Sequence, residues 1–243
     1  MKKETSATCI SMNKTILITG HSKGLGKAIT KKLLDTNHFH IVGISRTPAH
    51  LTHPLLTEIS ADLSDENQTT QLQNILSKYQ FHTILLNAGA NNIKPPEAYT
   101  LQEIQKIIQL NFTSNALLIK MCLNGILKNK GHIIGIGSYS GIEVKKWNNF
   151  YGSAKAGFHH LLRNLFEQYR KQGLKVSIVI PDIMYSEFYN HQEYQPLSEK
   201  EYALQINDVA EVISEWIICP PNYVPFEILL RPQMFQLKRK ETT

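Results

Sequence analysis

Short, nearly continuous hydrophobic runs recur along the chain, and longer stretches with apolar residues at helical spacing separate them. Uninterrupted apolar runs of this kind are typical of strands that are buried on both faces of a sheet. The pattern predicts seven strands, at Thr15–Thr19, Ile41–Ser45, Thr57–Ser60, Thr83–Asn87, His132–Gly137, Lys175–Ile180 and Phe226–Leu230.

The stretches between these runs predict helices. They cover Gly24–Thr36, Ser64–Tyr79, two segments within Glu97–Lys128, Asn148–Gln172 and Asn207–Cys219. Ser64 and Thr100 are candidate N-caps, and Gly173 and Pro220 follow the ends of helices, as is common for these residue types. The connection Arg46–Leu55 is too short and too rich in proline to predict a good helix.

The alternation of strands and helices predicts an α/β fold. We expect a single-domain, doubly wound Rossmann-type fold with about seven parallel strands and helices on both faces. No linker or repeat divides the 243 residues, so one catalytic domain is expected over 13–243, after a flexible tail over 1–12 in which Met12 is a hypothetical alternative start. The aperiodic stretch near 182–203 follows the sixth strand, where such sheets bind ligands, and is a candidate substrate lid.

Composition and charge narrow the class of protein. With 42% hydrophobic and 19% charged residues the chain is globular rather than disordered. The net charge of +6 comes without a nucleic-acid motif, and no apolar run is long enough to span a membrane, so neither partner is expected. The three cysteines Cys9, Cys122 and Cys219 have no disulfide or metal spacing, and the histidines have no matching ligands. We therefore expect no metal, and a reducing, cytoplasmic location without a secretory signal.

A glycine-rich loop, Thr-Gly-His-Ser-Lys-Gly-Leu-Gly over residues 19–26, follows the first strand and opens the first helix. Glycines permit a tight turn and let the backbone approach a pyrophosphate at the helix N-terminus, although an ordinary turn is the alternative. The residues expected to bind a dinucleotide here are Gly20, Ser22, Lys23, Gly24, Leu25 and Gly26.

The end of the second strand bears on the choice between NAD and NADP. A carboxylate there would bind the ribose 2′-hydroxyl of NAD, but the chain has Arg46, and its next acidic residue is Glu58. Arg46 and Lys23 instead offer cations for the 2′-phosphate of NADP. The sequence therefore predicts NADP(H), although either cation alone is more often a solvated surface residue.

Candidate chemistry gathers at the next strand ends. Tyr151 and Lys155 are four residues apart at the start of the long helix after the fifth strand, so they share one helix face. A nearby cation favours the phenolate of a tyrosine, whose ordinary pKa is about 10. Ser138, at the end of the fifth strand, is placed to donate to a carbonyl oxygen. Asn111 is unfavourable inside a helix, which indicates a polar task. Alone, Tyr151 and Lys155 would be an ordinary surface pair.

Taken in order, these motifs resemble the short-chain dehydrogenases/reductases. That family's pattern is a Thr-Gly-x3-Gly-x-Gly loop, an Asn-Ala-Gly, an Asn, a Ser and a Tyr-x3-Lys, and the resemblance covers about residues 14–234. It implies an NADP(H)-dependent oxidoreductase acting on a small-molecule carbonyl or alcohol substrate. It also implies roles: Tyr151 as general acid or base, Lys155 on the nicotinamide ribose, Ser138 on the carbonyl and Asn111 on a proton-relaying water.

The resemblance also implies further cofactor contacts. They involve Asp62, Leu63, Asn87, Ala88, Gly89, Tyr151, Lys155, Pro181, Ile183 and Ser186. The chain departs from the family after the sixth strand, where the family usually has Pro-Gly-x3-Thr. Asp182 stands in place of the glycine and Ser186 in place of the threonine, which leaves the path of this loop open.

Other readings and the substrate stay open. The resemblance suggests a homodimer or homotetramer. A cofactor-binding regulatory or scaffold protein with little turnover is the alternative function, against which the intact catalytic set weighs, and an epimerase or dehydratase would usually carry a larger C-terminal domain. Lys145 and Lys146 are candidates for attracting an anionic substrate, with solvated lysines as the commoner case. Aromatic and polar residues that would line the pocket or simply pack the lid are Asn91, Asn92, Ser140, Ile142, Trp147, Met184, Tyr185, Phe188 and Tyr189.

Overall fold

The computed structural model describes residues 14–190, 192, 194–199, 201–220 and 222–240. Seven parallel strands form one sheet in the order β10-β6-β5-β4-β1-β2-β3. The strands are β1 Lys14–Thr19, β2 Phe39–Ser45, β3 Leu56–Ser60, β4 Phe81–Leu86, β5 His132–Ile136, β6 Lys175–Pro181 and β10 Glu227–Leu230. The predicted doubly wound α/β fold with seven parallel strands is confirmed.

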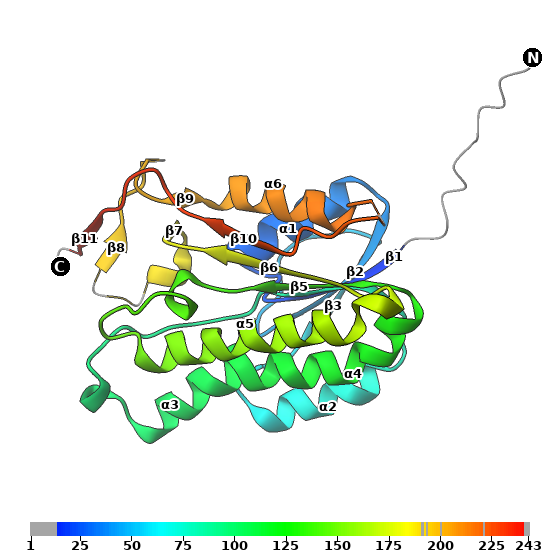
Figure 1. Ribbon diagram of the computed structural model, residues 1–243, viewed down its shortest axis with the longest axis horizontal. Helices are drawn as coiled ribbons and strands as arrows, with labels where there is room; N and C mark the ends of the chain where they lie inside the picture. Colours follow the sequence, from blue (N-terminus) through cyan, green and yellow to red (C-terminus); the bar gives the residue numbers. More distant parts are fainter. Residues whose placement is uncertain (1–13, 191, 193, 200, 221, 241–243) are drawn as a thin grey trace, which may run out of the picture.

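Helices cover both faces of the sheet (Figure 1). α1 (Gly24–Asp35) and α6 (Ile206–Ile217) lie together on one face, and α2 (Glu66–Leu76), α4 (Ser114–Lys128) and α5 (Asn149–Tyr169) lie on the other. Successive side chains of a strand point to opposite faces, so Ile16 and Ile18 of β1 pack under α1 while Leu17 packs into the core beneath α5. Burial on both faces explains why the strands are continuous apolar runs in the sequence.

Two predicted helix starts have different outcomes. Thr100 caps α3 (Leu101–Ile108), as predicted, in a capping box with Glu103. The prediction that Ser64 caps a helix is wrong, because α2 begins two residues later and the carboxylate of Asp65 accepts the backbone N–H of Gln68. Ser64 donates its hydroxyl to Asp62 instead, and the turn leaves the cap to Asp65.

The predicted helical region before the fifth strand contains a π turn that the sequence did not predict. After the short 3-10 turn η1 (Pro96–Ala98), α3 runs into a π turn, η2 (Gln109–Thr113), and then into α4. Other boundaries differ from the prediction by a few residues: α5 ends in the 3-10 turn η4 (Arg170–Gln172), and the last helix ends at Ile217 rather than Cys219. As predicted, Arg46–Leu55 contains no helix.

The segment predicted as a lid, 182–203, crosses the carboxyl ends of the strands and is held by two small sheets. β7 (Met184–Tyr185) pairs with β9 (Leu204–Gln205), and β8 (Tyr194–Pro196) pairs with β11 (Leu237–Arg239), with the turn η5 (Glu187–Tyr189) between β7 and β8. Residues 191, 193 and 200 of this segment lie outside the described residues, as does the predicted tail. Among the described helices none is long and apolar enough to cross a membrane.

Candidate active site

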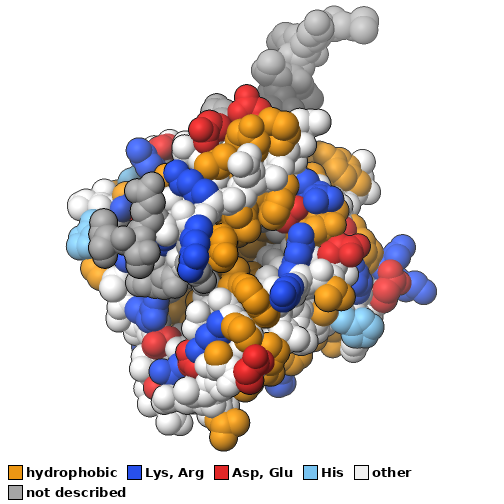
Figure 2. Space-filling model, turned by 90° about the vertical axis from the view of Figure 1, so that its left-hand side faces the viewer, with side chains coloured by type: hydrophobic (Ala, Val, Ile, Leu, Met, Phe, Trp, Pro, Cys, Tyr) orange, Lys and Arg blue, Asp and Glu red, His pale blue; other side chains and the backbone are white. Residues whose placement is uncertain are grey.

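The carboxyl ends of β1, β2, β4, β5 and β6 open into one cleft of about 1080 Å³, which is larger than most ligand pockets. Figure 2 shows this face of the molecule, where hydrophobic and basic side chains surround a hollow. The cleft brings together all the predicted site residues except Gly26 and Asn111, which lie behind its wall: it is lined by Gly20, Ser22, Lys23, Gly24, Leu25, Arg46, Asp62, Leu63, Asn87, Ala88, Gly89, Ser138, Tyr151, Lys155, Pro181, Ile183 and Ser186.

The glycine loop leaves the N-terminus of α1 open to the cleft. Gly20 and Gly24 adopt left-handed conformations with φ of 67° and 49°, which favour glycine. A Cβ on Gly24 would meet nothing within 4 Å, and no side chain of the described residues caps the helix, so its first N–H groups have no capping partner among them. A Cβ on Gly26 would lie 2.2 Å from the Gly20 carbonyl oxygen, so only glycine fits there. Free helix N–H groups beside open space suit a pyrophosphate.

The loop is also joined to the end of β4. The Asn87 amide donates to the carbonyl oxygens of Thr19, at 3.0 Å, and Gly20, at 3.3 Å. In return the Thr19 hydroxyl accepts the backbone N–H groups of Asn87 and Ala88 at 2.9 and 3.0 Å. These four hydrogen bonds fix the position of the glycine loop relative to the end of β4.

Two exposed cations, Lys23 and Arg46, line the cleft beside Asp62, and neither forms an ion pair with a described carboxylate. The nearest acidic residue after β2 is Glu58, which does not line the cleft. Its Oε1 atom accepts the Ala49 backbone N–H at 2.7 Å and contacts His21 Nε2 at 2.7 Å. This end of the cleft therefore offers two cations, and the carboxylate of Asp62 that lines it accepts the backbone N–H and the hydroxyl of Ser64.

Tyr151 and Lys155 lie deep in the cleft, with exposed fractions of 8% and 3%. Lys155 Nζ donates to the Ile136 carbonyl oxygen at 2.8 Å and lies 5.8 Å from the centre of the Tyr151 ring. Burial raises the pKa of Tyr151 to about 12, against the effect of a hydrogen bond with Ser138, and burial lowers the pKa of Lys155 to about 8. Burial is the largest influence on the Tyr151 pKa, and Ser138, rather than Lys155, is the group that lowers it.

Ser138 is held by a histidine that the sequence analysis missed. The Ser138 backbone N–H donates to Nε2 of His159 at 3.2 Å, and this ring is only 1% exposed. A Cβ on Gly137 would lie 2.1 Å from Nε2, and one on Gly141 would lie 2.8 Å from Cε1, so the two glycines make room for the ring. Burial lowers the pKa of His159 to about 4, which keeps it neutral and able to accept. Gly137 and Gly141, on either side of Ser138, were the signal in the sequence that a bulky side chain packs against this loop.

Asn111 lies in the π turn, fully buried behind the cleft wall. Its amide nitrogen donates to the carbonyl oxygens of Ala90 and Ile107, both at 2.9 Å, while Oδ1 is buried with no partner among the described residues. A Cβ on Gly89 would lie 2.9 Å from Oδ1 and 3.5 Å from Lys155 Nζ, so both atoms lie against Gly89. An unpaired buried acceptor beside an ammonium suits a bound water.

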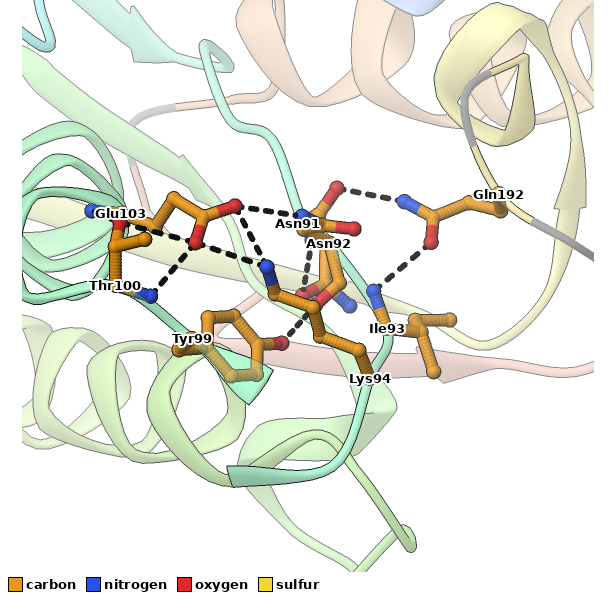
Figure 3. A network of polar contacts seen from close by, with 8 residues as sticks. All are labelled: Asn91, Asn92, Ile93, Lys94, Tyr99, Thr100, Glu103 and Gln192. Carbon is orange, nitrogen blue, oxygen red and sulfur yellow. Dashed lines mark hydrogen bonds and ion pairs between the residues drawn. The ribbon is translucent and has the colours of Figure 1, made fainter. Parts of the chain in front are cut away.

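The lid is joined to Ser138 by a chain of hydrogen bonds. Figure 3 shows buried Gln192 of the lid donating to the Asn91 carbonyl oxygen at 2.6 Å and accepting the Ile93 N–H at 2.9 Å. The Asn91 amide donates to Asn148 at 2.6 Å, Asn148 donates to Ser140 Oγ at 3.1 Å, and the Ser140 N–H donates to Ser138 Oγ at 3.2 Å. Gln192 was also missed, since its partners lie about a hundred residues earlier in the chain.

The loop after β6, where the sequence departs from the family pattern, continues the sheet for one residue. The Asp182 N–H donates to the Leu230 carbonyl oxygen at 2.9 Å, and its carboxylate accepts from Arg231 Nε at 2.9 Å. Ser186 accepts the Phe188 N–H at 3.4 Å and so begins η5. The aspartate thus anchors the loop to β10, and Pro181, Ile183 and Ser186 remain on the cleft.

Residues 14–196 match the family model described as short chain dehydrogenase. A protein of Staphylococcus epidermidis described as an uncharacterized oxidoreductase is 25% identical over 228 residues, which cover 90% of this chain and 97% of that protein. Among solved structures, an alcohol dehydrogenase from the archaeon Thermococcus sibiricus, complexed with 5-hydroxy-NADP, has a TM-score of 0.80 at 20% identity and covers 94% of this chain and 99% of its own. A 4-hydroxyisoleucine dehydrogenase complexed with NADH has a TM-score of 0.79 at 20% identity and covers 90% and 98%.

Proposed function

The chain belongs to the short chain dehydrogenase family of oxidoreductases, and from this premise we propose that it transfers a hydride between NADP(H) and a carbonyl or alcohol substrate. One observation carries the proposal. Tyr151 and Ser138 line the same part of the cleft, where Ser138 lowers the pKa of Tyr151 against the effect of burial, and the buried Lys155 ammonium lies 5.8 Å from the centre of the Tyr151 ring. Two donors and a cation converge on the place where a carbonyl oxygen would develop negative charge.

The dinucleotide would lie along the ends of β1, β2, β4 and β6. The open N-terminus of α1 would hold the pyrophosphate, Asp62 and Leu63 would contact the adenine, and Asn87, Lys155 and Ser186 are among the residues at the nicotinamide end. When bound, the dinucleotide supplies or takes up the hydride.

NADP(H) is proposed over NAD(H) because of charge. Lys23 and Arg46 are exposed without an ion pair to the described residues, and Glu58 is occupied by Ala49 and His21. The Thermococcus sibiricus enzyme carries an NADP derivative and the 4-hydroxyisoleucine dehydrogenase carries NADH. Because similarity of fold does not decide between the two dinucleotides, the proposal rests on Lys23 and Arg46.

In the direction of reduction, Tyr151 would donate its phenolic proton to the carbonyl oxygen, and Ser138 would donate a hydrogen bond to the same atom. With a pKa of about 12, Tyr151 is protonated at neutral pH and so begins as the acid. Lys155, with a pKa of about 8, is mostly an ammonium there and would stabilise the phenolate that forms. A water held by Asn111 Oδ1 would return a proton from the solvent towards Lys155.

A panel of aldehydes and ketones, scored by loss of NADPH absorbance with NADH in parallel, tests this proposal. We expect turnover of at least one compound, and Tyr151→Phe should lower kcat by about 10³-fold or more while NADPH still binds. Tyr139→Phe is the matched control, because this tyrosine also lines the cleft but has no role in the proposed proton transfer. Unchanged turnover in Tyr151→Phe would remove Tyr151 as the acid.

Binding of NADPH without turnover of any carbonyl compound would instead favour a regulatory or scaffold protein of the same fold. A second variant tests the cofactor: Arg46→Asp should shift the preference from NADPH towards NADH, and an unchanged ratio would place recognition of the 2′-phosphate elsewhere. One catalytic domain from residue 13 onwards, assembly as a homodimer or homotetramer, and a cytoplasmic location remain predictions.

A further inference from the structure

Charged side chains beyond Ser138 leave the substrate end of the cleft basic. Two carboxylates there are already neutralised: Glu103 binds Lys94 Nζ with both oxygens, at 2.7 and 2.8 Å (Figure 3), and Asp182 binds Arg231. Lys94 lowers the pKa of Glu103 to about 2, so this carboxylate is ionised and paired. The charged groups that remain in this part of the lining are Lys106, Lys145, Lys146 and Glu187.

Lys145 is unusual among these lysines because it is half-buried and lacks a carboxylate partner in the described part of the chain. Its Nζ lies 4.7 Å from the centre of the Tyr139 ring and 5.3 Å from that of Phe235. Aromatic faces attract a cation but do not cancel its charge. A partly desolvated ammonium without an anion is a place where a bound anion gains more than it would at an open surface.

The same loop brings a second cation to the rim. Lys146 Nζ lies 4.7 Å from the centre of the Trp147 ring, and both residues line the cleft. Trp147 has a φ of 64°, a conformation that is rare for a bulky side chain and that tends to persist at functional sites. The backbone of residues 145–147 is therefore held in an unfavourable turn that presents two lysines at the opening.

Lys145 opens on the same cleft as the proposed chemistry. Its ammonium lies over the ring of Tyr139, and Lys145, Tyr139 and Ser138 all line this cleft, so an anionic group held by Lys145 would share the cleft with the reacting carbonyl. The wall between them is partly aromatic: Phe188 of the lid lies 6.0 Å from the Tyr151 ring, centre to centre. Resting on the proposed carbonyl chemistry, we propose that the substrate is an organic acid, such as a keto or hydroxy acid, whose anionic group binds Lys145 with help from Lys146.

Matched pairs of an acid and its methyl ester test this inference, because the ester keeps the carbonyl and loses the charge. The probes are benzoylformate and methyl benzoylformate, with acetoacetate and methyl acetoacetate as a smaller pair. For each protein we take the kcat/KM of the acid divided by the kcat/KM of the ester. The decisive quantity is this ratio in the wild type divided by the same ratio in Lys145→Gln. The quotient cancels the difference in intrinsic reactivity between acid and ester.

We expect this quotient to be about 10-fold or more, through a higher KM for the acid, because a charge-assisted hydrogen bond is lost. Lys145→Arg should keep most of the preference. Lys128→Gln is the matched control, since Lys128 is an exposed lysine at the far end of α4. Raising the salt concentration should slow the acid and leave the ester unchanged.

Turnover of acid and ester with the same response to Lys145→Gln would overturn the inference while the proposed function stands. If no carbonyl compound is turned over, the proposed function fails, and calorimetric titration of benzoylformate and its methyl ester into the protein with NADP⁺ decides the inference alone. Binding of the acid that is lost in Lys145→Gln supports it, and equal or absent binding of both compounds overturns it.

Discussion

The floor of the cleft and its lid are built from different interactions. The floor, formed by Ser138, Tyr151 and Lys155 with Asn111 behind them, is largely buried and is held through backbone groups and the ring of His159. The lid, 182–203, is held by two small sheets, by Gln192 and by aromatic contacts. The floor is therefore complete once α5 and the π turn have packed on the sheet, whereas the lid is attached through its own small sheets and Gln192. We expect changes in the floor to alter kcat and changes in the lid to alter KM.

After Tyr151→Phe, removing the serine hydroxyl should have the largest effect on the floor. We expect Ser138→Ala to lower kcat by about 10²–10³-fold, because a donor to the developing oxyanion is lost, with NADPH affinity unchanged. Kinetics with any compound turned over in the panel, together with an NADPH titration, measure this. Ser140→Ala is the control, since its hydroxyl belongs to the chain that leads to the lid, and an equal loss in both variants would contradict a special role for Ser138.

Removing the support of Ser138 should cost less. His159→Leu should lower kcat by about 10–100-fold with a smaller change in KM, because the Ser138 backbone loses its acceptor and the hydroxyl shifts relative to Tyr151. His159→Gln, which keeps an acceptor, should recover part of the loss. His160→Leu, at the exposed neighbouring position, should be neutral. A loss of folding without a kcat defect in the folded fraction would make His159 a packing residue only.

Releasing the lid should change binding rather than chemistry. Gln192→Leu removes two hydrogen bonds worth about 1 kcal/mol each, so KM for the substrate should rise about 10-fold with kcat changed by no more than about 3-fold. Gln195→Leu changes the same residue type on β8, for which no side-chain hydrogen bond to the described residues is found, and serves as the control. A kcat loss as large as that of His159→Leu would erase the distinction between floor and lid.

Acid should destabilise the fold through two buried histidines, of which His159 supports the floor and His132 lies at the opposite end of β5. Burial lowers the pKa of His132 to about 3 and that of His159 to about 4, below the ordinary 6.5. Between these values and pH 6.5, both histidines are therefore protonated in the unfolded chain and neutral in the folded chain. Below about pH 6.5 the free energy of unfolding should fall towards pH 4, by at most about 1.4 kcal/mol per pH unit for each histidine. Urea unfolding across this range measures it.

A double variant isolates one of these histidines. His132 Nε2 lies 2.7 Å from Ser177 Oγ, so His132→Leu with Ser177→Ala removes both buried partners together. Its unfolding free energy should depend less steeply on pH than that of the wild type. The same slope in both proteins would show that His132 does not contribute.

The sequence was sufficient for the sheet because strands buried on both faces leave apolar runs that can be read directly. It was also sufficient for Thr100, where the capping box lies within four residues. It was insufficient for Asp65, since two neighbouring residues both suit an N-cap and only the turn geometry selects one. The pairs β7–β9 and β8–β11 contain strands of two or three residues, which are too short to show a period.

In the cleft, the sequence predicted residues whose motifs are local and missed those that act across the fold. His159 reaches Ser138 from 21 positions away, and Gln192 reaches Asn91 from 101 positions away. Only the packing of α5 on β5, and of the lid on the loop after β4, creates these contacts. Asn111 was identified as out of place in a helix, but nothing in its neighbours distinguishes a π turn from an α turn.

The π turn at Gln109–Thr113 bears on how the chain tolerates insertions and deletions. A π turn accommodates one residue more than an α turn, and each residue of an α-helix advances by about 100° around the axis. Deleting one residue here would restore α geometry and leave α3 and α4 facing nearly as they do now, because the wide turn contains the extra residue. The Asn111 amide would then leave the Ala90 carbonyl oxygen. Deleting a residue elsewhere in 101–128 would instead rotate one part of the helix by about 100° relative to the other, away from its packing on α5. The π turn is therefore the point in this helix where a change of length costs the Asn111 contact and spares the packing.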